Sequence, residues 1–237
     1  MGPETHSGPT GTAQRSVQVP SGMRRLTGIL AVPPRPRGVV LFAHGSGSGR
    51  HSPRNQFVAR VLQEAGLATL LIDLLEEAEA DDRAKVFDIE LLADRLRDAA
   101  GWLSEEDETH QLRLGVFGAS TGAGAALTMA ARQPDHVSAV VSRGGRPDLA
   151  MNDLPAVAAP TLLIVGGADE LVLELNEKAV RRLRCPKQLA VIPGATHLFE
   201  EPGTLEEAAR LAKDWFSRYL APAAVVSSPA RSGAIEP

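Results

Sequence analysis

Residues 118–122 carry a serine between two glycines, in the order Gly-Ala-Ser-Thr-Gly, and are the strongest chemical signal in the sequence. They follow the apolar residues 112–117, which predict a strand, and precede a predicted helix rich in small residues. A serine in such a tight turn presents its hydroxyl above the edge of a sheet, and the glycines let strand and helix approach closely. We therefore predict that Ser120 is a nucleophile. The backbone N–H of Thr121, at the start of the helix, would stabilise negative charge that develops on a substrate.

A serine hydroxyl is a weak nucleophile at neutral pH and needs a general base, which in turn needs an acid to orient it. Of the six histidines, His197 follows the last predicted strand, at the sheet edge where the serine lies. Asp169 directly follows another predicted strand, with Glu170 as the alternative acid. The chain order Ser120, Asp169, His197 is that of an α/β-hydrolase triad. Two further acids would require a different assignment of strands: Asp148 and Asp153. The other histidines lie in the N-terminal tail, before a strand, or ahead of the serine in the chain: His6, His44, His51, His110 and His136.

A second group of glycines follows the predicted strand at residues 38–43, in the order His-Gly-Ser-Gly-Ser-Gly. Because the carboxyl ends of parallel strands meet at one sheet edge, this loop should lie beside the serine. We predict that the Ser46 N–H is the second oxyanion donor, with Gly45 as the alternative, and that His44 holds the loop by hydrogen bonds. A phosphate cradle is the competing interpretation. The loop lacks both a Gly-Lys-Ser/Thr ending and the Gly-x-Gly-x-x-Gly pattern with an acid about twenty residues on, so we do not expect a nucleotide site.

Two arginines, Arg143 and Arg146, follow the strand that is predicted after the nucleophile helix. A guanidinium at that edge could bind a carboxylate or phosphate on the substrate. The alternative is that the arginines pair with Asp148 or Asp169 or lie in solvent. Leu198, next to the predicted base, should line the pocket. Because aromatic residues make up only 4% of the chain, we expect small to moderately sized acyl groups.

The elements that must position these residues alternate between strands and helices, which predicts a mainly parallel, eight-stranded, doubly wound α/β sheet. The first two strands should form a hairpin. The predicted strands are at residues 15–19, 26–31, 38–43, 68–72, 112–117, 137–142, 161–165 and 188–192. The predicted helices are at residues 55–65, 88–103, 121–132, 171–182 and 204–220. Thr204 and Glu207 predict a capping box at the start of the last helix. Residues 143–160 are too few for a large cap domain, so the pocket should be open.

The composition fits one soluble domain in a reducing compartment, which we take to be the cytoplasm. The 237 residues carry 25 Lys and Arg against 29 Asp and Glu, so the net charge is −4 and nucleic acid is not an expected partner. Cys185 is the single cysteine and can form neither an internal disulfide nor a Cys-rich metal site. No apolar run approaches the roughly 20 residues of a membrane helix, so no membrane association is expected. Residues 1–14 and 221–237 are predicted to be disordered tails around a domain at residues 15–220.

The sequence resembles the α/β-hydrolase superfamily in three landmarks that follow one another along the chain. They are the loop at His44, the turn at Ser120, and the loops at Asp169 and His197. The compact form, over about residues 15–220, is similar to the dienelactone-hydrolase-like branch. The resemblance implies a Ser/Cys–His–Asp hydrolase that cleaves small esters or lactones without a cofactor. Dienelactone hydrolases proper use a cysteine nucleophile, whereas this turn carries a serine, which argues against dienelactone itself as the substrate. Cys185 lies between a helix and a strand and cannot replace it.

Two other functions are compatible with the same residues. An acyltransferase or thioesterase would use the same triad with a different acceptor or substrate. A ligand receptor on a hydrolase fold would bind its ligand with turnover near background. The sequence makes no prediction about the oligomeric state.

Overall fold

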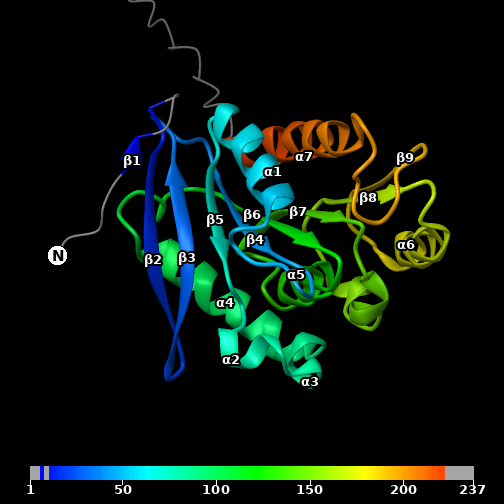
Figure 1. The fold of residues 1–237 in the computed structure, drawn as a ribbon, viewed down its shortest axis with the longest axis horizontal. Coiled ribbons are helices and arrows are strands. Elements are labelled where there is room, and N and C mark those ends of the chain that lie inside the picture. The colour runs from blue at the N-terminus through cyan, green and yellow to red at the C-terminus, as the bar shows by residue number, and fades with distance from the viewer. Residues whose placement is uncertain (1–5, 8–10, 222–237) are drawn as a thin grey trace, which may run out of the picture.

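A nine-stranded sheet runs through the molecule, in the order β1-β2-β3-β5-β4-β6-β7-β8-β9. The structure is a computed structural model that describes residues 6–7 and 11–221. Figure 1 shows the sheet with the N-terminal hairpin at one end. The strands are β1 (His6–Ser7), β2 (Ala13–Ser21), β3 (Arg24–Val32), β4 (Val39–Ala43), β5 (Ala68–Ile72), β6 (Leu114–Ala119), β7 (Val137–Arg143), β8 (Thr161–Gly166) and β9 (Lys187–Ile192).

Strand direction separates the sheet into two parts. The hairpin of β2 and β3 pairs antiparallel with β5, whereas all neighbours from β5 to β9 are parallel. Every residue of β4, β5, β6 and β8 is buried, as expected for strands that helices cover on both faces. The parallel part therefore directs the carboxyl ends of six neighbouring strands to one edge.

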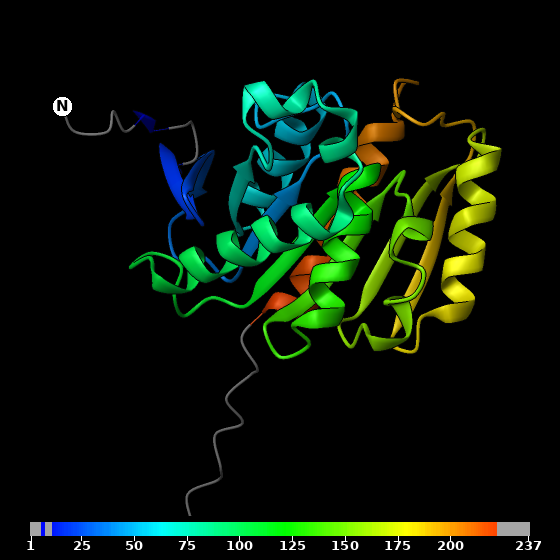
Figure 2. The same ribbon diagram turned by 90° about the horizontal axis from the view of Figure 1, so that it is seen from below.

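Helices cover both faces of the sheet, as Figure 2 shows. One face packs against α1 and α7 and the other against α4, α5 and α6, and each face has its own hydrophobic core. The helices are α1 (Pro53–Glu64), α2 (Glu77–Ala80), α3 (Arg83–Val86), α4 (Ile89–Glu105), α5 (Thr121–Arg132), α6 (Glu170–Arg182) and α7 (Thr204–Leu220). None of the described helices is long and apolar enough to cross a bilayer.

The predicted α/β-hydrolase fold, with a mainly parallel doubly wound sheet, is confirmed, and all eight predicted strands are present. The ninth strand, His6–Ser7, pairs with β2, which begins at Ala13 within the predicted N-terminal tail. Of the predicted C-terminal tail, residues 222–237 lie outside the described residues. Between β7 and β8 the chain forms only two short 3-10 turns, Pro147–Ala150 and Leu154–Ala156, and no cap domain is present among the described residues.

Two local predictions differ from the structure. The short helices α2 and α3 lie within residues 73–87, for which no helix is predicted, because their stability depends on tertiary contacts rather than on a long apolar period. The predicted capping box at α7 is wrong. Gly203, with φ of 81°, is the N-cap, and the Thr204 hydroxyl donates instead to the carbonyl oxygen of Glu201, at 2.7 Å.

Strand register brings the predicted site residues to the same level of the sheet. Ala43 at the end of β4 is level with Gly118 in β6, and Ala119 is level with Arg143 in β7. The glycine-rich loop and the serine turn therefore leave the sheet side by side. The loops that follow β8 and β9 leave at the same edge, as is usual for functional loops in open α/β sheets.

Candidate active site

Ser120 occupies a strained turn between β6 and α5. Its φ is 51° and its ψ is −123°, a combination that a residue with a side chain rarely adopts. Steric contacts explain why glycines flank this serine on both sides. A Cβ on Gly118 would lie 2.4 Å from the Cα of Ala123, and one on Gly122 would lie 2.2 Å from the carbonyl oxygen of Ala43. The turn therefore has the geometry of a nucleophile elbow.

Ser120, His197 and Asp169 form a continuous chain of hydrogen bonds. The Ser120 Oγ lies 3.3 Å from the Nε2 of His197, and the Nδ1 of His197 lies 2.7 Å from the Oδ2 of Asp169. With the imidazole neutral, Nδ1–H donates to the carboxylate and Nε2 accepts from the serine hydroxyl, which is the arrangement that a general base requires. The loops that carry Asp169 and His197 pack closely against each other, since a Cβ on Gly166 would lie 2.3 Å from the carbonyl oxygen of Ala195.

The alternative acids lie elsewhere. Glu170 is the exposed first residue of α6, whereas Asp169 immediately precedes that helix. Asp148 binds Arg146, and Asp153 accepts a hydrogen bond from the hydroxyl of Thr128. Of the acids considered, Asp169 is the one that binds the imidazole of the predicted base.

The two predicted oxyanion donors lie next to each other. The Ser46 N–H donates to the Thr121 Oγ1 at 3.0 Å, which joins the glycine-rich loop to the first residue of α5. Gly45, the alternative donor, is in contact with the nucleophile, since a Cβ there would lie 2.8 Å from the Cβ of Ser120. The glycine-rich loop therefore contacts both Ser120 and the first residue of α5.

The His44 side chain contacts the backbone at the start of the glycine-rich loop. Its Nδ1 lies 3.2 Å from the carbonyl oxygen of Gly45, and its Nε2 lies 3.4 Å from the backbone N–H of Leu74. Burial lowers the pKa of the His44 imidazole, although the nearby Asp73 opposes the shift. A neutral ring can donate from Nδ1 to Gly45 and accept at Nε2 from Leu74, so His44 fixes the start of the loop.

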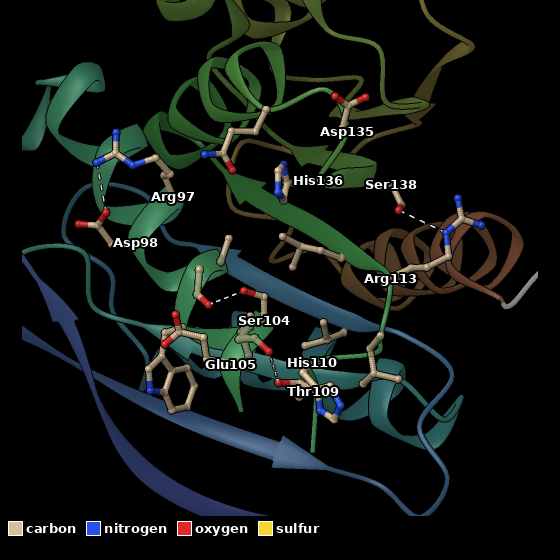
Figure 3. A pocket seen from close by; sticks show the side chains of 18 of the residues that line it. Arg97, Asp98, Ser104, Glu105, Thr109, His110, Arg113, Asp135, His136 and Ser138 are labelled. Carbon is tan, nitrogen blue, oxygen red and sulfur yellow. Dashed lines mark hydrogen bonds and ion pairs between the residues drawn. The ribbon is translucent and has the colours of Figure 1, made fainter. Parts of the chain in front are cut away.

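A cavity of about 740 Å³ opens beside the oxyanion donors. Its lining includes Ser46 and Thr121 on one side and Leu75 and Ala80 on the other. Its volume suits a small-molecule ligand. The larger cavity, about 910 Å³, lies at the opposite edge of the sheet, where β4 and β6 begin. Figure 3 shows it surrounded by side chains that include Arg97, His110 and His136, none of which belongs to the triad.

Arg143 is buried, with its guanidinium beside Phe199, two residues after His197. Its residue surface is only 7% exposed, and its guanidinium lies 5.9 Å from the ring of Phe117 and 5.8 Å from that of Phe199. Nη2 lies 3.5 Å from the Oδ1 of Asn55, whereas the buried Nη1 has no hydrogen-bond partner among residues 6–7 and 11–221. Burial, with a smaller contribution from the nearby Arg54, lowers the pKa of Arg143 to about 10, so the group stays charged at neutral pH.

The other two predicted substrate contacts have different surroundings. Arg146 makes two hydrogen bonds to the carboxylate of Asp148, at 2.8 and 2.7 Å, which is one of the alternatives that the sequence left open. Leu198 is 41% exposed and follows the catalytic histidine directly. Phe199, the next residue, is buried with φ of 56°.

Proteins of known structure resemble this fold. The dienelactone hydrolase of Anabaena variabilis is 54% identical, with a TM-score of 0.85, and the match covers 92% of this chain and 99% of that chain. Est1E of Butyrivibrio proteoclasticus has a TM-score of 0.75 over 86% of this chain and 98% of its own, but at 16% identity it shows the fold alone.

A curated relative from Mycobacterium tuberculosis, provisionally named a phosphoribosyl transferase, is 61% identical over 204 residues. That match covers 86% of this chain but 46% of the relative, so the chain spans about half of that protein's length. The family profile of dienelactone hydrolases matches residues 26–221, a span that contains Ser120, Asp169 and His197. This chain therefore belongs to the dienelactone hydrolase family, a family of hydrolases with the α/β-hydrolase fold.

Proposed function

We propose that this protein is a serine hydrolase that cleaves carboxylic esters or lactones of small to moderate size through a covalent acyl-enzyme. The observation that carries the proposal is the hydrogen-bond chain from Ser120 through His197 to Asp169, built on a serine with φ of 51°. The family is one of hydrolases, which supports the reaction class. Because the proposed nucleophile is a serine rather than a cysteine, we favour other esters and lactones over dienelactone itself as substrates.

Acylation begins when the Nε2 of His197 takes the hydroxyl proton and the Ser120 Oγ bonds to the substrate carbonyl carbon. Negative charge then develops on the carbonyl oxygen, where the N–H groups of Ser46 and Thr121 can donate to it. Asp169 stabilises the imidazolium through Nδ1–H. Collapse of the intermediate breaks the bond to the leaving oxygen, which takes the proton from Nε2. Water then repeats the sequence on the acyl-enzyme and releases the acid.

We further propose that Arg143 favours substrates with a negatively charged group. A buried guanidinium without a carboxylate partner is energetically costly, and an anion from the substrate would offset that cost. Arg143 is a better candidate than Arg146, whose guanidinium already binds Asp148. Because Nη1 is buried, binding requires a displacement of the side chains around it. Leu198, exposed beside the base, would contact the apolar part of the substrate.

A panel of p-nitrophenyl esters, thioesters and lactones tests the reaction class. We expect ester or lactone turnover that Ser120→Ala lowers on the order of 10⁴-fold or more and that Asp169→Asn lowers strongly. Cys185→Ala is the matched control, since Cys185 contacts Thr161 at the far end of β8 and should leave turnover unchanged. A folded and fully active Ser120→Ala protein would overturn the proposal.

The same panel separates the alternatives. Faster thioester cleavage, or transfer to added alcohols or amines in competition with water, would indicate a thioesterase or acyltransferase on the same triad. Tight binding with turnover near background would indicate a receptor. We assign no phosphoribosyl transfer to this chain, because its family is one of hydrolases and it spans 46% of the relative that bears that name.

A further inference from the structure

The side chain of Thr121 contacts the proposed oxyanion hole. Its Oγ1 accepts the Ser46 N–H at 3.0 Å, while its own backbone N–H is the other donor. Thr121 is 4% exposed, and both residues line the cavity of about 740 Å³. The mechanism above uses the backbone of Thr121 and leaves this hydroxyl without a role.

Beyond the His44 contacts at its start, the loop that carries the Ser46 N–H has few internal hydrogen bonds. Three of its residues are glycines, and glycine leaves the backbone the widest conformational freedom. Gly47 adopts φ of 68°, and a Cβ there would have no atom within 4 Å, so this part of the loop faces open space. One backbone bond, from the Ser48 N–H to the Gly45 carbonyl at 3.2 Å, closes the turn.

Helix α5, in contrast, is a rigid support. Its first ten residues are buried, and the tight glycine contacts on either side of the serine fix where it begins. A hydrogen bond from the loop to Thr121 therefore joins the Ser46 donor to the buried first turn of α5. An oxyanion hole works through donors that are already oriented before the reaction begins, so the orientation of Ser46 has a direct effect on rate.

We propose that the Thr121 hydroxyl is a positioning group of the oxyanion hole, a role that rests on the proposed serine hydrolase function. In the empty site its Oγ1 accepts the Ser46 N–H and keeps that donor aimed beside the nucleophile. When the tetrahedral intermediate forms, the N–H turns to the charged oxygen, because a hydrogen bond to a charged acceptor is roughly twice as strong as one to a neutral hydroxyl. The exchange favours the transition state over the bound substrate, and its effect should appear in kcat rather than in KM.

Replacement of Thr121 by Val and by Ser tests this role. Valine keeps the branched shape and lacks the hydroxyl, whereas serine keeps the hydroxyl. We expect Thr121→Val to lower kcat by about 10- to 100-fold, below the loss of a whole oxyanion donor, with KM changed less than about twofold. Thr121→Ser should retain most of the activity. The control is Thr128→Val in the same helix, whose buried hydroxyl binds Asp153 away from the site; it should leave kcat unchanged.

A trifluoromethyl ketone, which forms a charged tetrahedral adduct with the serine, provides a readout that a purely structural role would not move. Its affinity for Thr121→Val should fall by the same factor as kcat/KM, while the affinity for a non-reactive substrate analogue stays constant. Three results would overturn the inference: an unchanged kcat, a higher kcat because the hydroxyl had obstructed the donor, or equal losses in Thr121→Ser and Thr121→Val. Because Ser120→Ala tests the proposed function separately, a dead Ser120→Ala beside a fully active Thr121→Val would reject the inference alone.

Discussion

At the residue scale, the candidate active site contains three hydrogen-bonded polar side chains and, close by, a buried guanidinium with one unpaired nitrogen among the described residues. Ser120, His197 and Asp169 are joined at 3.3 and 2.7 Å in the order that acyl transfer requires. Arg143 is different, since its buried Nη1 has no partner among the described residues. A positive charge beside Phe199, two residues after the proposed general base His197, should affect which substrates bind.

The charge preference of the enzyme tests the proposed role of Arg143. We expect esters with a free carboxylate or phosphate to have a kcat/KM about ten- to a hundredfold above that of capped, neutral analogues, a factor that fits one good charged contact. Arg143→Gln should abolish this ratio. The ratio within one protein sample does not depend on the fraction that is folded, so it tolerates some loss of stability. Arg146→Gln is the control and should preserve the ratio; equal rates for charged and neutral esters in the natural protein would exclude a substrate role for Arg143.

At the element scale, close backbone approaches hold the site together. The serine turn requires Gly122, because a Cβ there would come within 2.2 Å of the Ala43 carbonyl oxygen in β4. Gly101, in the exposed middle of α4, meets no atom within 4 Å and has no such constraint. A side chain at residue 122 would therefore require the neighbouring backbone to shift, whereas a side chain at residue 101 would not.

Alanine substitution distinguishes these two glycines. Gly122→Ala should lower both the melting temperature and kcat, since β4 and the elbow must separate to admit the methyl group. Gly101→Ala should raise the free energy of unfolding by about 0.5–1 kcal/mol, because alanine favours the helix, with kcat unchanged. Thermal denaturation and ester turnover on both variants are sufficient. Wild-type stability and activity in Gly122→Ala would contradict the described geometry of the elbow.

The short helices α2 and α3, which form one wall of the cavity, depend on a buried carboxylate. Glu79 binds Arg95 through two hydrogen bonds of 2.7 and 3.1 Å, and it also binds Lys85. The hydrogen bond from Arg95, with smaller contributions from Lys85 and Glu76, lowers the pKa of Glu79 from 4.5 to about 2. Since the folded-state pKa lies below the unfolded value, this contribution to stability is complete above about pH 4.5 and is lost as the pH falls towards 2.

The matching experiment compares Glu79→Gln with the natural protein across this pH range. At pH 7 we expect the variant to be less stable by about 3 kcal/mol, as when one partner of a buried ion pair is removed. The difference in unfolding free energy should shrink between pH 4.5 and 2, because the natural carboxyl then becomes neutral as well. Glu90→Gln, at the exposed pair with Arg132, is the control and should show a much smaller effect. A pH-independent difference would mean that the charge of Glu79 does not stabilise the fold.

At the scale of the whole molecule, the two cavities lie at opposite edges of the sheet. The larger one, lined by His110, Arg113 and His136, is distant from the nucleophile. Arg113→Gln and His136→Ala should therefore leave kcat/KM within about twofold of the natural enzyme, the range expected for surface changes away from the site. A loss on the scale of Asp169→Asn would indicate that this cavity takes part in the reaction.

Sequence patterns predicted the sheet and the chain order of the triad because both depend on local signals. A glycine-flanked serine after an apolar strand is readable without any knowledge of distant contacts, and strand alternation determines which edge the loops share. Tertiary packing and side-chain geometry determine the surroundings of Arg143, the pairing of Arg146, and the hydrogen bond between Ser46 and Thr121. No spacing rule predicts such pairs. The short helix α2 was missed for the same reason, since its buried glutamate is held by an arginine from α4.

The central claim, a serine acyl-enzyme, is tested most directly by trapping the intermediate. A slowly hydrolysed p-nitrophenyl ester should give a burst of nitrophenol equal to the enzyme concentration, and intact mass spectrometry should show a mass increase of one acyl group. Peptide mapping should locate that group on the peptide that contains Ser120, and Ser120→Ala should show neither burst nor adduct. Turnover with no covalent adduct, or an acyl group on Cys185 instead, would contradict the account.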